Sequence, residues 1–166
     1  MSWLAADTIE RAVERCADND VVRRAFRGVY PHNRLPLLLP LNDDDDLPLS
    51  LIVNTDSHNL PGRHWTSVYI DKQRHGELFD SLTTPPSAHL ARFMSHHSRR
   101  WVTNRLVYQH PLSSYCGVYV LLHVLQRHNY DSLETFCTTH FTSSLTHNET
   151  VVRDYYRYHL YPKLLR

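Results

Sequence analysis

The pattern of apolar and polar positions predicts two helices at the start of the chain. Residues 3–16 carry apolar side chains at near-helical spacing, with acidic and basic side chains between them, which is typical of an amphipathic helix. A second, shorter helix is predicted next, with Asp18 or Asn19 as its cap and Gly28 at its end. The chain therefore opens with helical structure before its first predicted strand.

The middle of the chain has the pattern of β-strands. Residues 49–55, 64–70 and 77–81 are rich in β-branched, aromatic and other apolar side chains and are separated by turn-forming segments. They predict three strands of an antiparallel meander, in which residues 71–76 connect the second strand to the third. Residues 101–108 alternate enough to predict a fourth strand.

Helical patterns return in the second half of the chain. Residues 87–97 follow two prolines and predict a surface helix with proline at its start. Residues 118–125 are apolar on nearly every face, so we expect their helix to be buried centrally. Two more helices are predicted, one over residues 133–141 and a last one that Asn148 can cap. The order of helices, strands and helices indicates an α+β fold with a mostly antiparallel sheet.

The composition predicts a single domain over residues 1–166. A chain of 166 residues with 42% hydrophobic and 21% charged residues can bury one substantial core. No apolar run approaches the ~18 residues that span a bilayer, and the first residues lack the pattern of a secretory signal, so we expect no membrane association. A net charge of +1 gives only weak support for DNA as a partner.

Three cysteines, Cys16, Cys116 and Cys137, are an odd number at wide spacing. That favours free thiols in a reducing, intracellular compartment over a disulfide framework. Cys16 and Cys137 lie on the apolar sides of predicted helices, and we interpret both as core residues. Cys116 differs, because a polar segment ends there and the apolar helix begins. Unpaired N–H groups and the positive end of the helix dipole favour a thiolate at such a position.

A thiol-dependent acyl-transfer enzyme needs three further groups, and the chain offers a candidate for each. His64 begins the second strand and can act as the base, Asp80 near the end of the third strand can orient that imidazole, and the Gln109 amide can donate to an oxyanion. The two strands place His64 directly opposite Asp80 only if their hairpin is centred on Lys72. The predicted connection is centred later and sets Asp80 nearer Ser67 or Val68. An earlier turn or a bulge can absorb that difference, so the count allows the pairing of His64 with Asp80 and does not prove it.

Two alternatives from other classes stay open at this stage. A catalytically silent binding domain can use the same scaffold. A zinc protein is suggested by the thirteen histidines and by Cys137 and His140, which are spaced as one half of a ligand set without a matching second pair.

The chain resembles the adenovirus-type cysteine proteases, which belong to the wider clan of SUMO and ubiquitin-like-protein proteases. The resemblance covers roughly residues 50–125 and rests on four segments in the family's order. These segments are Ile52-Val53-Asn54-Thr55, Gly62-Arg63-His64-Trp65, Leu78-Phe79-Asp80-Ser81, and Gln109 with six residues before Cys116-Gly117. It implies an adenain-like fold in which Cys116 is the nucleophile, His64 the base and acid, Asp80 the orienting carboxylate and Gln109 an oxyanion donor.

The resemblance also implies a substrate class, namely proteins cut at glycine-containing sites. These are viral or mobile-element precursors or, as the alternative, host ubiquitin-like conjugates, and a viral enzyme would act in the host nucleus or the virion. Tyr115 replaces the aspartate that SUMO-type members carry before the nucleophile, and the segment from Gln109 is longer, which favours the viral branch. The sequence indicates no required cofactor and leaves a peptide or DNA activator open. No cysteine lies between residues 17 and 115, so we expect no disulfide-linked peptide there.

Overall fold

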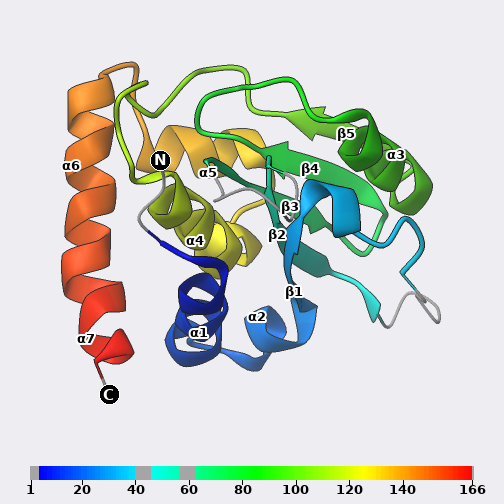
Figure 1. The fold of residues 1–166 in the computed structure, drawn as a ribbon, viewed down its shortest axis with the longest axis horizontal. Helices are drawn as coiled ribbons and strands as arrows, with labels where there is room; N and C mark the ends of the chain where they lie inside the picture. Colours follow the sequence, from blue (N-terminus) through cyan, green and yellow to red (C-terminus); the bar gives the residue numbers. More distant parts are fainter. Residues whose placement is uncertain (1–3, 40–45, 57–62, 166) are drawn as a thin grey trace.

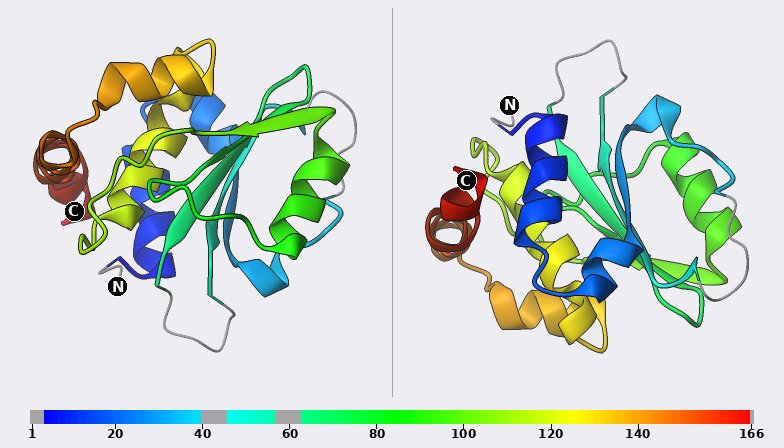
Figure 2. Two further views of the ribbon diagram at one scale, coloured as in Figure 1. Left: turned by 90° about the horizontal axis from the view of Figure 1, so that it is seen from above. Right: turned by 90° about the horizontal axis from the view of Figure 1, so that it is seen from below.

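The computed structural model describes residues 4–39, 46–56 and 63–165, and it forms three layers with a sheet in the middle (Figures 1 and 2). The strands are β1 (Phe26–Pro31), β2 (Leu49–Asn54), β3 (Trp65–Ile70), β4 (His75–Phe79) and β5 (Arg100–Thr103). The α-helices are α1 (Ala6–Cys16), α2 (Asp20–Ala25), α3 (Ala88–His97), α4 (Cys116–Gln126), α5 (Leu133–His140), α6 (Leu145–Tyr155) and α7 (Tyr161–Leu164), with short turns of other helix types at η1 (His32–Arg34), η3 (Arg127–Asn129) and η4 (Tyr156–Leu160).

The sheet has the strand order β1-β2-β3-β4-β5 and is mixed in direction. Its three central strands are antiparallel, which confirms the predicted meander. Both outer pairs are parallel, so the expectation of a mostly antiparallel sheet holds only for the centre. The parallel pairing of β4 with β5 requires a crossover, and α3 provides it.

Each face of the sheet packs against its own apolar core. Helix α4 is buried along ten of its residues and lies on one face with α1, α5 and α6, as predicted for an apolar segment without a polar side (Figure 2). Helix α3 covers the other face through Leu90, Phe93 and Met94. The helix predicted to lie on the surface therefore has one buried, apolar side. Its N-cap is Ser87, which directly follows the two prolines.

Three local predictions were wrong. The second helix ends at Ala25, and the chain continues directly into β1, where Gly28 adopts a φ of 110° at an irregularity in the register. The predicted fourth strand is shorter, because only Arg100–Thr103 pairs. The last helix begins at Leu145 with Ser144 as its cap, and Asn148 lies inside it, fully buried.

Residues 57–62, which include most of the turn-rich segment before His64, lie outside the described part of the chain. Within the described ranges, no helix combines the length and apolar character that crossing a bilayer requires.

Candidate active site

Cys116 is the first residue of α4, as the sequence predicted. Its side chain is buried, and the helix that follows is fixed on the sheet by apolar packing. The first N–H groups of a helix have no acceptor within the helix, and they carry the positive end of its dipole. A sulfur at this position therefore lies in a field that favours its anionic form.

His64 and Asp80 form a buried pair, with 2.6 Å between Nε2 of the imidazole and Oδ1 of the carboxylate. The strand register explains how they meet. Ser67 pairs with Phe79, so one further step sets Asp80 level with Thr66, two positions from His64 and on the same face of the sheet. The offset is smaller than the sequence count predicted, and the side chains bridge it without a bulge.

The imidazole of His64 also interacts with Cys116, so the structure brings His64, Asp80 and Cys116 together. Because Nε2 is engaged by Asp80, Nδ1 is the nitrogen that remains for the sulfur. Burial alone would lower the pKa of His64, but hydrogen bonds and charge interactions with Asp80 and Cys116 outweigh it and raise the pKa to about 9. The protonated imidazole is thus the favoured form at neutral pH.

The carboxylate of Asp80 is itself held rigidly. Its Oδ1 also accepts from the N–H of Leu82 at 2.8 Å, and its Oδ2 accepts from the N–H of Thr84 at 2.9 Å. Asn104 binds the backbone of Asp80 on both sides, accepting from its N–H at 2.8 Å and donating to its carbonyl at 2.7 Å. These contacts fix the orientation of the Asp80 carboxylate independently of its hydrogen bond with His64.

Gln109 is buried in the segment that leads to Cys116, and its amide has two partners. Its Oε1 accepts from the hydroxyl of Ser81 at 2.6 Å, and its Nε2 donates to the carbonyl of Ser113 at 3.0 Å. A carbonyl can only accept, so this contact identifies the nitrogen end of the amide. Among the described residues no other acceptor binds Nε2, which leaves its second hydrogen for another partner.

Sequence reasoning missed Ser81, Asn104 and Ser113, which hold the predicted residues in place. Ser81 directly follows Asp80, and its carbonyl accepts from the backbone N–H groups of Tyr108 and Gln109 at 2.9 and 3.1 Å. The position of Ser81 beside a predicted acid was the available signal. The sequence around Asn104 does not indicate its contact with Asp80, because that contact depends on the parallel pairing of β4 and β5.

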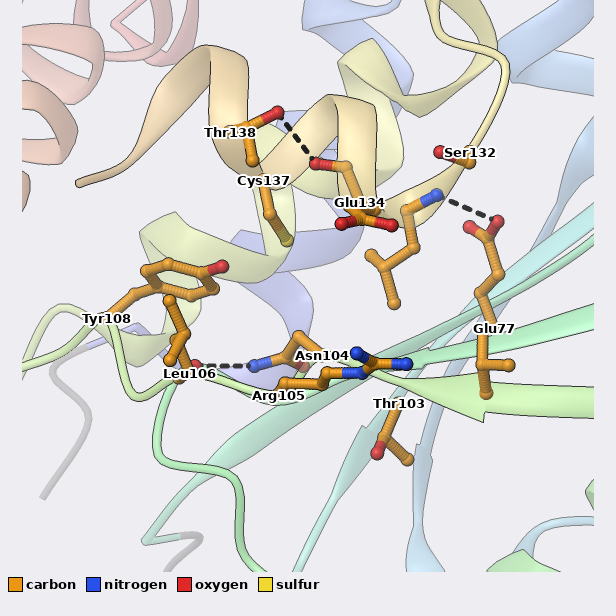
Figure 3. A pocket seen from close by; sticks show the side chains of 12 residues that line it. Glu77, Thr103, Asn104, Arg105, Leu106, Tyr108, Ser132, Glu134, Cys137 and Thr138 are labelled. Atoms are coloured by element: carbon orange, nitrogen blue, oxygen red, sulfur yellow. Dashed lines mark hydrogen bonds between the residues drawn. The ribbon is translucent and has the colours of Figure 1, made fainter. Parts of the chain in front are cut away.

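A cavity of about 640 Å³ lies between the segment after β5 and helix α5, and neither His64 nor Cys116 lines it (Figure 3). Its wall includes Tyr108 and the last of the three cysteines, Cys137, whose thiol has its pKa raised to about 12, chiefly by burial. This cavity is therefore not the candidate active site, and Cys137 is not poised to react.

The zinc alternative gains no support. Cys137 interacts with Tyr108, whereas His140 shares a hydrogen bond of 2.9 Å with the hydroxyl of Tyr130. Across the part of the chain that the structure describes, no group of three or more potential ligands could hold a metal ion.

Sequence comparisons find no relatives: no protein-family model matches the chain, and no curated protein matches it. Solved structures do match. The pS273R protease of ASFV aligns with a TM-score of 0.63 and 18% identity over 96% of this chain and 67% of that one. The central domain of the uncharacterized Lpg1148 protein from Legionella pneumophila gives a TM-score of 0.51 and 12% identity, with both chains covered completely.

These similarities show that the chain has the fold of the pS273R protease. The predicted fold class, α+β with a sheet packed on a central helix that starts at Cys116, is thereby confirmed. The SUMO protease Ulp1 is a more remote match, with a TM-score of 0.44 and 15% identity over 90% of this chain and 76% of that one. This chain spans 43% and 67% of the lengths of the two pS273R structures that it matches.

Proposed function

We propose that this protein is a cysteine endopeptidase with Cys116 as its nucleophile. The observation that carries the proposal is the buried contact of His64 with both Cys116 and Asp80, with the sulfur at the first residue of a buried helix. This is the combination of nucleophile, base and orienting acid that acyl transfer needs. The fold shared with the pS273R protease adds independent support.

In the acylation step, the thiolate of Cys116 attacks the scissile carbonyl carbon, a C–S bond forms and the carbonyl oxygen becomes an oxyanion. The N–H at the start of α4 and the second hydrogen of the Gln109 amide stabilise that charge. The C–N bond then breaks, and the imidazolium of His64 gives its proton to the leaving amine. A pKa of about 9 keeps that proton in place at neutral pH.

In the deacylation step, the neutral imidazole of His64 takes a proton from water. The resulting oxygen nucleophile attacks the thioester, a C–O bond forms and the C–S bond breaks. This restores the thiolate and the imidazolium. Asp80 keeps Nε2 protonated throughout, so Nδ1 is always the nitrogen that exchanges the proton.

For substrates, we propose glycine-containing sites in viral or mobile-element precursor proteins, acted on in a reducing intracellular compartment. The support is the family resemblance of residues 50–125, the match to a protease of ASFV, and three cysteines that are all free thiols. The alternative within the same chemistry is the removal of ubiquitin-like proteins from host conjugates.

A peptide-library cleavage profile tests the proposal, run with and without DNA. Wild-type protein and a Cys16→Ser control should cleave after or near glycine at equal rates, whereas Cys116→Ala and His64→Ala should be inactive but folded by circular dichroism. Cleavage that survives Cys116→Ala would overturn the proposal and favour a binding domain whose scaffold is catalytically silent. Higher activity with DNA would identify DNA as an activator.

Activity-based probes separate the two substrate classes. Ubiquitin and SUMO carrying an electrophile at their C-terminal glycine should leave wild-type protein unlabelled if it processes precursors. Covalent capture through Cys116, absent in Cys116→Ala, would instead assign the host-conjugate alternative.

A further inference from the structure

The carboxylate of Glu149 in α6 contacts the segment between Gln109 and Cys116 at two points. It accepts from the hydroxyl of Ser113 at 2.6 Å and from the backbone N–H of His110 at 3.3 Å. It also accepts from the hydroxyl of Tyr119 in α4 at 3.1 Å. The side chain is only half-buried, yet it joins the nucleophile helix, the segment before it and the C-terminal helix.

Ser113 is the point where these contacts converge. Its hydroxyl oxygen accepts from the N–H of Tyr115 at 3.1 Å, and its carbonyl accepts from the Nε2 of Gln109 at 3.0 Å. A hydroxyl has one hydrogen, and a carboxylate can only accept. Glu149 therefore fixes the direction in which Ser113 donates and leaves the oxygen lone pairs for Tyr115, the residue that precedes Cys116.

The neighbouring residue of α6 holds the other end of the same segment. Asn148 is fully buried and donates to the carbonyl of Tyr108 at 3.1 Å. The hydroxyl oxygen of Tyr119 lies 3.0 Å from that carbonyl oxygen and 3.1 Å from the Glu149 carboxylate, so its one hydrogen can bond to either acceptor. Two consecutive residues of α6 thus bracket the segment that carries Gln109.

We propose that Glu149 is a positioning residue for oxyanion stabilisation: through Ser113 it aligns the amide of Gln109 and the backbone that leads to the Cys116 N–H. This inference rests on the proposed function, because it concerns the transition state of the same reaction. Glu149 does not touch the reacting atoms. A misaligned donor loses most of its effect, since oxyanion stabilisation depends on preorganised geometry.

The test uses the full chain and the variants Glu149→Gln and Ser113→Ala, with Glu14→Gln on the exposed side of α1 as the matched control. Glutamine keeps the size of the side chain but removes the charge and replaces one acceptor oxygen by a donor. A fluorogenic peptide amide ending in Gly-Gly-aminomethylcoumarin gives kcat and KM. The matching Gly-Gly aldehyde gives a Ki, because the thiolate adds to its carbonyl carbon and its oxygen takes the place of the oxyanion.

For Glu149→Gln we expect kcat to fall by about tenfold or more with little change in KM, and the aldehyde Ki to rise by a similar factor. Ser113→Ala should give a similar loss, and the double variant should lose clearly less than the two single losses combined, since both substitutions remove the same hydrogen bond between Ser113 and Glu149. The rate of Cys116 alkylation by iodoacetamide should stay within twofold of wild type, because the contact with His64 is intact.

Three results would overturn the positioning role: an alkylation rate of Cys116 that falls as much as kcat, a kcat that does not change, or losses of kcat that add up in the double variant. A melting temperature more than a few degrees below that of the control, with kcat restored on cooling, would assign Glu149 to stability alone. Failure of the proposed function is a separate result: wild-type protein would then neither cleave the peptide nor bind the aldehyde.

Discussion

Replacing Asp80 by asparagine removes the charge beside His64 and almost no volume. The present carboxylate accepts three hydrogen bonds, from His64, Leu82 and Thr84. An amide has one acceptor oxygen, so at least one of these N–H groups would face an NH₂ group. If the amide oxygen takes the Oδ2 position and keeps Thr84, its NH₂ group faces His64. The imidazole must then present a lone pair at Nε2 and carry its hydrogen on Nδ1, which is the wrong tautomer for accepting a proton from Cys116.

The size of the effect expected for Asp80→Asn follows from the pKa of His64. The difference between 6.5 and about 9 corresponds to about 3 kcal/mol of preference for the protonated ring, or on the order of 10²-fold in the ratio of protonated to neutral ring. Burial opposes this preference, and the hydrogen bond to Asp80 is the largest of the interactions that create it. We therefore expect Asp80→Asn to lose much of that factor, with the thiolate population of Cys116 falling in parallel.

The assay is alkylation of Cys116 by iodoacetamide between pH 5 and 10, followed by mass spectrometry, which needs no knowledge of the substrate. At pH 6 the rate for Asp80→Asn should be about 10- to 100-fold below that of wild type. Asp131→Asn, an exposed position without a role in the site, serves as the control. A rate within twofold of wild type at pH 6 would refute the electrostatic role of Asp80.

The same raised pKa predicts the alkaline limb of peptide cleavage. Wild-type kcat/KM should fall above about pH 9, where His64 loses the proton that the leaving amine needs. The free energy of unfolding should change with pH in the same direction. Because the pKa of His64 is raised in the native state, its contribution to stability is fully present below about pH 6.5 and is lost as pH rises through about 9. In Asp80→Asn both transitions should move to lower pH; an alkaline limb that stays in place would show that another group causes it.

Two further predictions concern the relative reactivity of the cysteines and a buried ion pair. Iodoacetamide should modify Cys116 at least about 10-fold faster than Cys16 or Cys137 at pH 7, because burial raises the pKa of the latter two thiols; equal labelling would contradict this. Arg127→Met should lower the free energy of unfolding by about 3–5 kcal/mol in urea titrations. The substitution removes the cation that binds the buried carboxylate of Glu77 at 2.6 Å. Adding Glu77→Gln should recover part of the loss, because no unpaired charge then remains buried.

Much of the site could be predicted from local sequence. The change from a polar segment to an apolar helix at Cys116, the strand that starts beside His64 and the acid at the end of the next strand are all short-range patterns. They sufficed because the meander connects neighbouring strands by a tight hairpin, which brings His64 and Asp80 together with little freedom.

The remainder depends on contacts between distant parts of the chain. The first three residues of strand β1 were predicted as the end of a helix, because the pairing of β1 with β2 is parallel and leaves no local turn signal. Asn104 and Glu149 were missed for the same reason: each reaches a segment 24 or more residues away through a side chain that is unremarkable in its own neighbourhood. Asn148 was read as a cap because asparagine is common there, whereas its amide satisfies buried backbone groups.

The anchors on α6 have a consequence for the order of events during synthesis. Asn148 and Glu149 lie about 40 residues after the segment that they hold. A ribosome releases the chain from its N-terminus, so the sheet, His64 and Cys116 emerge before those anchors do. A nascent chain would thus contain His64, Asp80 and Cys116 while the segment before Cys116 is not yet held in place. The geometry for oxyanion stabilisation would be complete only once α6 has packed beside that segment (Figure 1).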